Sequence, residues 1–506
     1  MEEIKPVTIE AINSHLGEIR LDHCSPVRVY GSEKLRREMG ETTLVQACNM
    51  RLCPGVEGVV LTPDAHQGFG APIGCVMATP SHIYPGPVGV DMDCSMSLLQ
   101  FDLPAEAIAE KTLRRALINA ITKRIPTGYK RSSTSSKYSD RLIETALIQG
   151  ATENICDDLG VPKEWICRCE DTAHLGHDGT SDALALRIEH IKNNIAHAKG
   201  SVWNFHDKIQ QLGSYGGGNH FGECEIVRLA ESEKNAFSTV SSPSVAQTFG
   251  LVDGNVAFLS HCGSRGFGAE LARSQFKLLK EKFEKWGIPF PSGDPQLIYA
   301  PIGTPEADDY LDDMALAANF STLNHLVINS LIVDAFQEII PSVRASLIYH
   351  ISHNMARKEI IDGRPLWIHR KGATRAYPAN HFSLVGTPFE RVGHPILLPG
   401  NPCGGSAVMT ALEGAKNSYY SINHGAGRAM GRKKAMQELV QYEVDKALDE
   451  ADILYNSRNY PLDEAPSAYK NFEEVLRSVE SAGLARCVAR LHAKFVIKDS
   501  YSKPDD

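Results

Sequence analysis

Long uninterrupted apolar runs, a recognisable secretory leader and internal repeats are all missing from this 506-residue chain. The most apolar stretch, residues 325–340, is interrupted by Asn329, Asp334 and Glu338, so we expect no membrane-spanning helix. Residues 1–6 contain no basic segment leading into an apolar one, which predicts a cytoplasmic protein. The absence of repeats and low-complexity tracts argues against a solenoid.

An excess of positive charge is also missing, because the net charge is −9. This excludes a generally basic protein that coats nucleic acid. The charge is uneven, however, since residues 111–137 hold eight Lys or Arg and no Asp or Glu. Lys123, Arg124, Lys130 and Arg131 in this segment suit a phosphate backbone, although charge alone favours a solvated helix face followed by a polar loop.

The twelve cysteines are scattered and do not indicate a disulfide framework. The one close pair, Cys167 and Cys169, is followed by His174 and His177. These four side chains could hold zinc, but their spacing is not that of a standard zinc finger. We therefore favour a surface insertion.

Hydrophobic patterning mixes strands and helices without a regular βαβ rhythm, which predicts an α+β fold with mixed β-sheets and flanking helices. We expect strands at residues 59–62, 88–91 and 257–260, helices at 105–122, 183–198, 309–340 and 426–456, and loop insertions near 150–180 and 229–247. We expect residues 1–506 to form a single domain. The last helix would place His424 at a helix N-terminus, where the helix dipole favours a phosphate.

The most informative motif is residues 423–430, Asn-His-Gly-Ala-Gly-Arg-Ala-Met. Its glycines let backbone N–H groups approach an anion, and Arg428 can grip a phosphate oxygen. Held beside such an anion, His424 can attack phosphorus and carry a phosphoryl or nucleotidyl group.

Four further sites contain residues that ligate metals. Asp91 and Cys94 are three positions apart, while His220, His261 and His353 each lie beside small residues. One carboxylate, one thiolate and three imidazoles suffice for two ions that share the thiolate. Manganese, zinc and iron all fit such mixed donors, and a close metal pair suits phosphoryl chemistry.

Together these motifs resemble the RtcB-type RNA ligases, from about Val59 to Lys498. The matching segments are residues 63–68, 88–91 with Cys94, 218–221, 261–266, 352–354, 369–376, 399–400, 424–428, 463–466 with Tyr469 and Lys470, and Lys498. The resemblance implies an RtcB-type fold. It also implies an enzyme that joins an RNA 3′-phosphate or 2′,3′-cyclic phosphate end to a 5′-hydroxyl end, using GTP and manganese.

The resemblance implies a role for each site residue. His424 takes GMP from GTP and passes it to the RNA phosphate, and the 5′-hydroxyl then displaces it. Asp91, Cys94 and His220 would hold one manganese ion, and Cys94, His261 and His353 the other. The guanine nucleotide would contact Asn219, Glu223, Asn354, Pro399, Gly400, Asn401, Pro402, Ser406, Gly425, Ala426, Gly427, Tyr469 and Lys498.

Partners are implied in the same way. Arg370 and Arg375, together with Lys123, Arg124, Lys130 and Arg131, are expected RNA contacts. The RNA would be broken tRNA, broken ribosomal RNA or tRNA halves, and the family often works with archease.

The chain departs from the family pattern at a few positions, which indicates a divergent paralogue. Asp93 and Ser95 replace glycines beside Cys94, Gly431 replaces a serine, His325 replaces an arginine, and Pro402 and Cys403 are unusual in the nucleotide loop. Two alternatives stay open: a metal-dependent phosphodiesterase or phosphatase that processes RNA ends without ligation, and a non-catalytic RNA-end binder.

Overall fold

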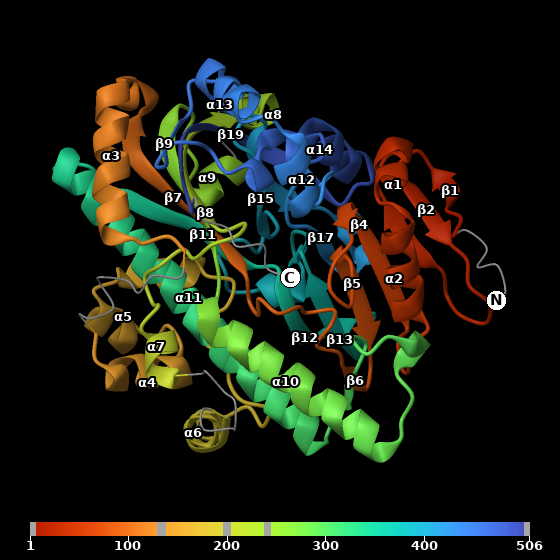
Figure 1. Ribbon diagram of the computed structural model, residues 1–506. Coiled ribbons are helices and arrows are strands. Elements are labelled where there is room, and N and C mark those ends of the chain that lie inside the picture. The colour runs from red at the N-terminus through yellow and green to blue at the C-terminus, as the bar shows by residue number, and fades with distance from the viewer. Residues whose placement is uncertain (1–6, 129–137, 196–203, 237–243, 500–506) are drawn as a thin grey trace.

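The computed structural model describes residues 7–128, 138–195, 204–236 and 244–499. Two mixed β-sheets and the helices around them form the fold (Figure 1), and the expected α+β class is confirmed. The first sheet has the strand order β11-β7-β9-β8-β19-β16-β15, and β18 (Leu454–Tyr455) pairs with β19 outside this path. Its strands are β7 (Ser95–Pro104), β8 (Phe221–Leu229), β9 (Asn255–Cys262), β11 (Ala345–Ser352), β15 (Pro395–Asn401), β16 (Gly405–Ala411) and β19 (Ala485–Lys498).

The second sheet has the strand order β1-β2-β3-β4-β5-β13-β12. Its strands are β1 (Glu10–Asn13), β2 (Leu16–Ile19), β3 (Val27–Tyr30), β4 (Gly58–His66), β5 (Ile73–Thr79), β12 (Asn354–Ile361) and β13 (Arg364–Lys371). Helix α2 (Glu41–Arg51) packs on β3, β4 and β5, at the right of Figure 1. A separate short pair joins β14 (Ala373–Arg375) to β17 (Ser421–Asn423).

Strand register brings several expected ligands to one end of the first sheet. Ser95 of β7 is paired with Cys262 of β9 on one side and with Ser352 of β11 on the other. Phe221 of β8 is paired with His261 and with Lys498. The residues next to these pairs in the chain are therefore neighbours in space, although they come from five different strands.

Helix α11 (Pro305–Ile339) runs diagonally across the lower left of Figure 1 and packs beside α10 (Arg265–Trp286). Thr304 caps its N-terminus by accepting a hydrogen bond from Ala307 N, and Pro305 occupies the first turn, where no N–H partner is needed. By length and composition this helix could cross a membrane, which the interrupted apolar stretch did not predict. Because 89% of its most apolar window is buried inside the protein, it is a core helix.

Several expected elements are confirmed. Residues 59–62 lie in β4, 257–260 in β9 and 309–340 almost entirely in α11. The helix expected at 105–122 corresponds to α3 (Lys111–Arg124), preceded by the short 3-10 helix η1 (Ala105–Ile108). The helix expected at 183–198 corresponds to α6 (Ser181–His190) and the π-helix Ile191–Ile195, and residues 196–198 lie outside the described residues.

Two expected elements are wrong, and in each case a glycine with positive φ lies near the start of the expected element. Residues 88–91 form a turn after Pro85 and Pro87, with Gly89 at φ +95°, so Cys94 precedes a strand instead of following one. The helix expected at 426–456 is two shorter helices, α12 (Arg432–Glu438) and α13 (Gln441–Glu450). Gly427 adopts φ +73°, which breaks the helical pattern, and His424 follows β17 rather than beginning a helix.

The segments expected as loops are partly helical. Residues 150–180 contain α5 (Glu153–Leu159) and the 3-10 helix η3 (Lys163–Arg168), with Ile155 and Trp165 buried in the main core. The described part of 229–247 contains α8 (Glu231–Ala236) and the start of α9 (Val245–Phe249). Polar composition hid these helices, because their buried residues are few and spaced apart.

Candidate active site

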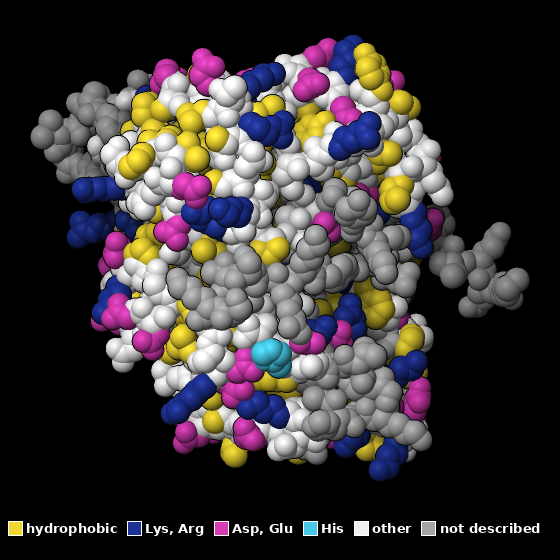
Figure 2. Space-filling view, turned by 60° about the vertical axis from the view of Figure 1, so that its left-hand side comes forward, with side chains coloured by type: hydrophobic (Ala, Val, Ile, Leu, Met, Phe, Trp, Pro, Cys, Tyr) yellow, Lys and Arg dark blue, Asp and Glu magenta, His cyan; other side chains and the backbone are white. Residues whose placement is uncertain are grey.

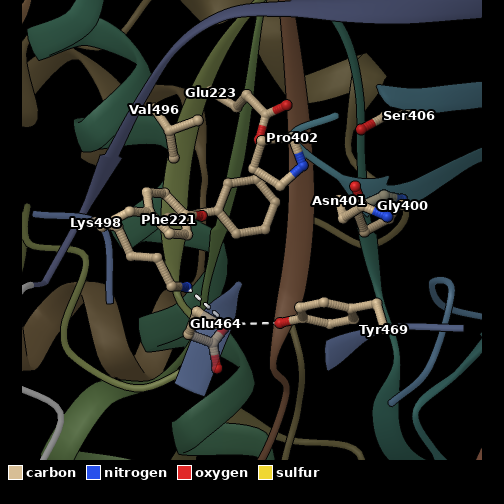
Figure 3. Close-up of a pocket in the computed structure, with 12 residues that line it drawn as sticks. Phe221, Glu223, Gly400, Asn401, Pro402, Ser406, Glu464, Tyr469, Val496 and Lys498 are labelled. Atoms are coloured by element: carbon tan, nitrogen blue, oxygen red, sulfur yellow. Dashed lines mark hydrogen bonds and ion pairs between the residues drawn. The ribbon is translucent and has the colours of Figure 1, made fainter. Parts of the chain in front are cut away.

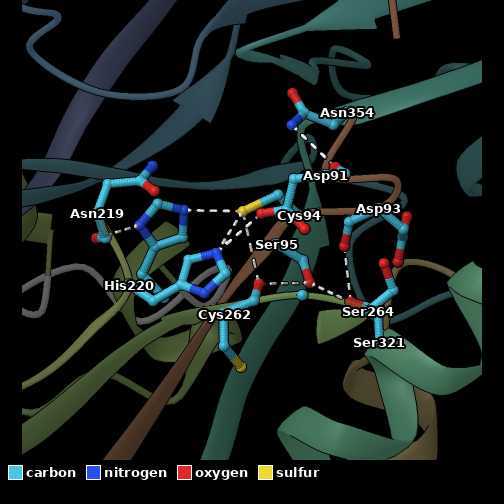
Figure 4. Close-up of polar contacts among 12 residues, drawn as sticks. Asp91, Asp93, Cys94, Ser95, Asn219, His220, Cys262, Ser264, Ser321 and Asn354 are labelled. Atoms are coloured by element: carbon cyan, nitrogen blue, oxygen red, sulfur yellow. Dashed lines mark hydrogen bonds and ion pairs between the residues drawn. The ribbon is translucent and has the colours of Figure 1, made fainter. Parts of the chain in front are cut away.

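A compact group of metal-ligating atoms lies at the end of the first sheet (Figure 4). Cys94 Sγ is 3.1 Å from His261 Nε2 and 3.4 Å from His220 Nε2. Asp91 Oδ2 is 2.9 Å from His220 Nε2, and His353 Nε2 is 3.3 Å from His261 Nε2. All five expected metal ligands are therefore brought together.

The chemistry of these donors fits a metal ion. Within the described part of the chain, Cys94, His220 and His261 are the only group of three or more His, Cys, Asp or Glu atoms close enough to share an ion. The Nδ1 atoms of His220 and His261 lie 2.9 Å from Tyr215 O and 3.2 Å from Asn219 O. Donating there, each ring turns its Nε2 lone pair toward the thiol.

Burial favours the neutral forms of the His261 and His353 rings and of the Cys94 thiol. It lowers the pKa of His261 and of His353 well below the ordinary value, and the neighbouring histidines lower it further. Burial also raises the pKa of the Cys94 thiol, and the nearby Asp91 carboxylate adds to that rise. Neutral imidazoles are the form that binds metal, and a cation beside the thiol would lower its pKa again.

His424 lies next to this group and is oriented by a carboxylate. Its Nδ1 atom is 2.9 Å from Oδ2 of the fully buried Asp64, and its ring centroid is 4.8 Å from that of His353. Asp64 Oδ1 in turn accepts a hydrogen bond of 2.5 Å from the Thr62 hydroxyl. With Nδ1–H donated to Asp64, Nε2 of His424 carries the free lone pair.

Sequence reasoning did not assign a role to Asp64. The only available signal was its position in the matched segment 63–68, directly after a buried strand. Two further residues hold this strand end in place. Lys470 Nζ donates to Ala65 O at 2.7 Å, and a Cβ atom on Gly427 would lie 2.1 Å from Asp64 O.

A polar pocket opens beside the site (Figure 3). Eight of the expected nucleotide-binding residues line it, namely Glu223, Pro399, Gly400, Asn401, Pro402, Ser406, Tyr469 and Lys498. Phe221, Tyr460, Glu464 and Val496 also line it, and none of them was assigned a role from the sequence. Ala426 N donates to Pro399 O at 3.0 Å, so the loop of His424 shares a wall with the pocket.

Charged groups in the pocket are paired or neutral. Glu464 accepts from Tyr469 OH at 2.6 Å and lies 3.0 Å from Lys498 Nζ. Burial raises the pKa of Glu464, but the charges of Lys498, Arg432 and Arg428 outweigh it and bring the pKa to about 2. Burial raises the pKa of Glu223 to about 7, so this carboxyl can exchange a proton near neutral pH.

The other expected nucleotide contacts lie nearer the metal-ligating atoms. Asn354 Nδ2 donates to Asp91 O at 3.1 Å, and Asn219 O faces His261. Gly425, Ala426 and Gly427 directly follow His424. The expected nucleotide-binding residues therefore fall into two groups. One group lines the pocket, and the other lies near His261 and His424.

The guanidinium groups of Arg370 and Arg375, two expected RNA contacts, have ion-pair partners inside the protein. Arg370 is 3% exposed, forms a bidentate pair with Glu359 and donates to Ser421 Oγ at 2.8 Å. Arg375 pairs with Glu170 and Asp171. Both guanidinium groups are already engaged inside the protein, which residue type alone could not reveal.

The remaining basic candidates are less constrained. Lys123 is exposed at the end of α3, while Arg124 forms an ion pair with Glu338. Lys130 and Arg131 lie outside the described residues. On the coloured surface in Figure 2, Lys and Arg side chains are interspersed with Asp and Glu instead of forming one continuous basic patch.

The thiols of Cys167 and Cys169 form hydrogen bonds within their own segment. They donate to Glu164 O and Trp165 O, within the same 3-10 turn. His177 pairs with Asp312 of α11, with Nδ1 at 3.0 Å from Oδ2.

The unusual residues around Cys94 belong to a hydrogen-bond network beneath it (Figure 4). Asp93 adopts φ +55°, which is costly for a residue other than glycine. Ser321 Oγ of α11 donates to Asp93 O at 2.7 Å and lies 2.8 Å from Ser95 Oγ. His325 reaches Ser95 O and Ser97 Oγ at 3.1 and 2.8 Å, so these departures support one another.

A histidine with a directed lone pair, a group of metal-ligating atoms and a polar pocket form the arrangement of a metal-dependent group-transfer site. The family model described as "tRNA-splicing ligase RtcB" matches residues 46–499. The chain therefore belongs to the RtcB family, and the resemblance inferred from its motifs is confirmed.

Relatives from archaea and bacteria agree with this assignment. The tRNA-splicing ligase RtcB of Nanoarchaeum equitans is 33% identical over 490 residues, covering 94% of this chain and 95% of the relative. That of Pyrobaculum aerophilum is 30% identical over 522 residues, covering 98% and 100%. The RNA-splicing ligase RtcB of Mycobacterium tuberculosis is 30% identical over 464 residues, covering 88% and 98%.

Proposed function

We propose that this protein is a GTP- and manganese-dependent RNA ligase that acts in RNA repair or tRNA splicing. It would join an RNA 3′-phosphate or 2′,3′-cyclic phosphate end to a 5′-hydroxyl end through a guanylylated His424. The observation that carries the proposal is the orientation of His424. Its Nδ1 lies 2.9 Å from the buried Asp64, while its ring packs against the candidate metal ligand His353.

The first step is nucleotidyl transfer to His424. Its Nε2 lone pair attacks the α-phosphorus of GTP, forming a P–N bond while the bond to the leaving pyrophosphate breaks. The imidazole becomes positively charged, and Asp64 stabilises that charge by holding the Nδ1 proton. An RNA 3′-phosphate oxygen then attacks the same phosphorus and releases the histidine, and the 5′-hydroxyl finally displaces GMP.

The metal ligands divide into two sets that share a thiolate. Asp91, Cys94 and His220 would hold one Mn²⁺, and Cys94, His261 and His353 the other. When bound, the two ions neutralise phosphate charge and help the leaving group depart. The surrounding protein contributes by fixing the ring orientations through Tyr215 O and Asn219 O.

The pocket of Figure 3 is the proposed seat of the guanine nucleotide. Its buried carboxyl, Glu223, can accept hydrogen bonds from a base that donates, and its hydroxyl and ammonium groups, Ser406 and Lys498, offer donors. Asn219, Asn354 and the glycine-rich loop after His424 would face the phosphates.

The deciding experiment is incubation with Mn²⁺ and GTP labelled at the α-phosphate, followed by a denaturing gel. We expect an acid-labile labelled band that is lost in His424→Ala while the variant keeps its fold. A band of normal yield in that variant would sink the assignment. Hydrolysis of cyclic phosphate ends without GTP, and without joining, would instead support the phosphodiesterase alternative.

The RNA substrate and activator are tested next. We propose tRNA or ribosomal RNA fragments as substrates, and archease as a stimulating partner. Ligation of labelled fragments with and without archease measures both.

A further inference from the structure

An acidic pair, Glu170 and Asp171, reaches into the protein from the segment that the sequence indicated as a surface insertion. Glu170 is 3% exposed at its side chain and Asp171 is 29% exposed. Their carboxylates pair with Arg375 of β14 and with Arg357 of β12. These four charges link three separate parts of the chain directly behind the candidate active site.

Glu170 is bonded to the end of β11, immediately before His353. Its backbone N–H donates to His350 O at 2.9 Å, and its Oε2 accepts from Ser352 N at 3.1 Å. The next residue in the chain is hydrogen-bonded to the site itself, because His353 N donates to Cys94 O at 2.9 Å. Glu170 therefore fixes the backbone that presents the His353 ring.

The ring of His353 depends on that backbone more than the other two imidazoles do. His220 and His261 have their Nδ1 atoms facing backbone carbonyls, whereas Nδ1 of His353 has no hydrogen-bond partner among the described residues. With no ring hydrogen bond of its own, His353 is aimed by its main chain and by packing against its neighbours.

The arginine side of the network leads to His424. Arg375 lies opposite Ser421 in the β14–β17 pair, and Ala373 lies opposite Asn423, the residue before His424. Ala373 N also donates to His353 O at 3.1 Å. The same short strand thus connects the acidic pair to both rings, whose centroids are 4.8 Å apart.

Buried ion pairs often stabilise a fold little more than apolar residues of the same size would, so stability alone does not explain four charges here. Burial raises the pKa of Glu170, but the charges of Arg375 and Arg357 outweigh it and lower the pKa below its ordinary value. Both acids therefore stay ionised near neutral pH, and their bonds are directional.

We propose that Glu170 and Asp171 are positioning residues that set the His353 ring relative to His424 and to the ion shared with His261. The expected effect on catalysis rests on the proposed function, whereas the expected effect on metal binding concerns only the candidate ligand His353. Neither acid contacts the reacting atoms. Each acts on the site through Arg375, Arg357 or the backbone N–H of Ser352.

The test is a metal titration of the full-length Glu170→Gln/Asp171→Asn variant. Mn²⁺ is added to chelator-treated protein, and bound ions are counted and their affinities measured by calorimetry. We expect the first ion to bind as in the parent, and the second to bind about 10- to 100-fold more weakly, the usual effect of losing an outer support. In the labelled-GTP assay we expect slower adduct formation with an unchanged KM for GTP.

The matched control is Asp313→Asn, which removes one of the two acids that pair with the buried Arg187, the other being Asp309. Asp313 pairs bidentately with Arg187, at 2.8 and 2.9 Å, between α11 and α6. We expect this variant to melt at a lower temperature yet bind both ions as the parent does. If the double variant behaves like this control, the pair is merely structural and the proposal is overturned.

A charge-balanced variant covers the case in which the first one does not fold. Glu170→Gln with Arg375→Gln removes an acid and a base together, so fewer buried charges stay unpaired. We expect the same weakened second ion, and parent-like binding would refute the proposal. If the parent forms no GMP adduct, the proposed function fails, while the metal titration still decides the role of the acidic pair.

Discussion

Nδ1 of His424 lies 2.9 Å from Oδ2 of Asp64, although 360 positions separate the two residues in the chain. This contact predicts that Asp64→Asn forms the GMP adduct more slowly, by on the order of 100-fold, because the charge that stabilises the imidazolium is gone. Rapid-quench sampling of the labelled adduct measures the rate. Adduct formation at the parent rate would show that Asp64 does not orient the nucleophile.

Thr62 provides a graded control for that experiment. Its hydroxyl donates to Asp64 Oδ1 at 2.5 Å and is within 2.9 Å of Gly74 O. Thr62→Ser keeps the hydroxyl and should form the GMP adduct at the parent rate. Thr62→Val removes the hydroxyl and should slow adduct formation, but less than Asp64→Asn does.

Cys94→Ala should lose both metal ions, because the thiolate is the donor that the two proposed ligand sets share. Metal analysis by mass spectrometry after gel filtration counts the ions per chain. Cys262→Ala is the matched control, since that neighbouring thiol accepts from Asn324 Nδ2 and takes no part in the ligand group. Two ions still bound to Cys94→Ala would contradict a bridging thiolate.

Gly427→Ala should destabilise the protein and impair the site. The residue adopts φ +73°, which costs a side chain about 1–2 kcal/mol, and the new Cβ would lie 2.1 Å from Asp64 O. Thermal melting and the adduct assay should both show the loss. Gly431→Ala is the control, because its Cβ meets nothing within 4 Å and should change stability by less than about 1 kcal/mol.

Glu223→Gln should stabilise the protein at alkaline pH and leave it unchanged at acid pH. The pKa of Glu223 is raised by burial from 4.5 to about 7, so the folded state holds this proton more tightly than the unfolded chain. Stability is therefore lost as pH rises through this window, by on the order of 3 kcal/mol once the carboxyl ionises. Melting temperatures at pH 4 and pH 8 measure the difference.

The surface variant Glu438→Gln on α12 should give the same melting temperature as the parent at both pH values. If Glu223→Gln is no more stable than the parent at pH 8, ionisation of the Glu223 carboxyl does not destabilise the folded protein, and the prediction is wrong.

The sequence alone determined the family, and it predicted the five candidate metal ligands and the candidate nucleophile His424, because each depends on residue types in a fixed order. It also predicted the central residues of strands β4 and β9 and most of helix α11, since apolar runs and helical periodicity are local signals. Two local interpretations were wrong, at residues 88–91 and 426–456, and in each a glycine with positive φ lies near the start, where backbone geometry overrode hydrophobic pattern.

Only the tertiary structure decided which charged groups face one another. Arg370 and Arg375 have the composition of an RNA contact, yet their guanidinium groups are engaged by Glu359, Glu170 and Asp171 inside the protein. The Asp64–His424 contact was likewise invisible in the sequence. Contacts between segments hundreds of residues apart depend on strand register and burial, and these are set when the two sheets and α11 pack together.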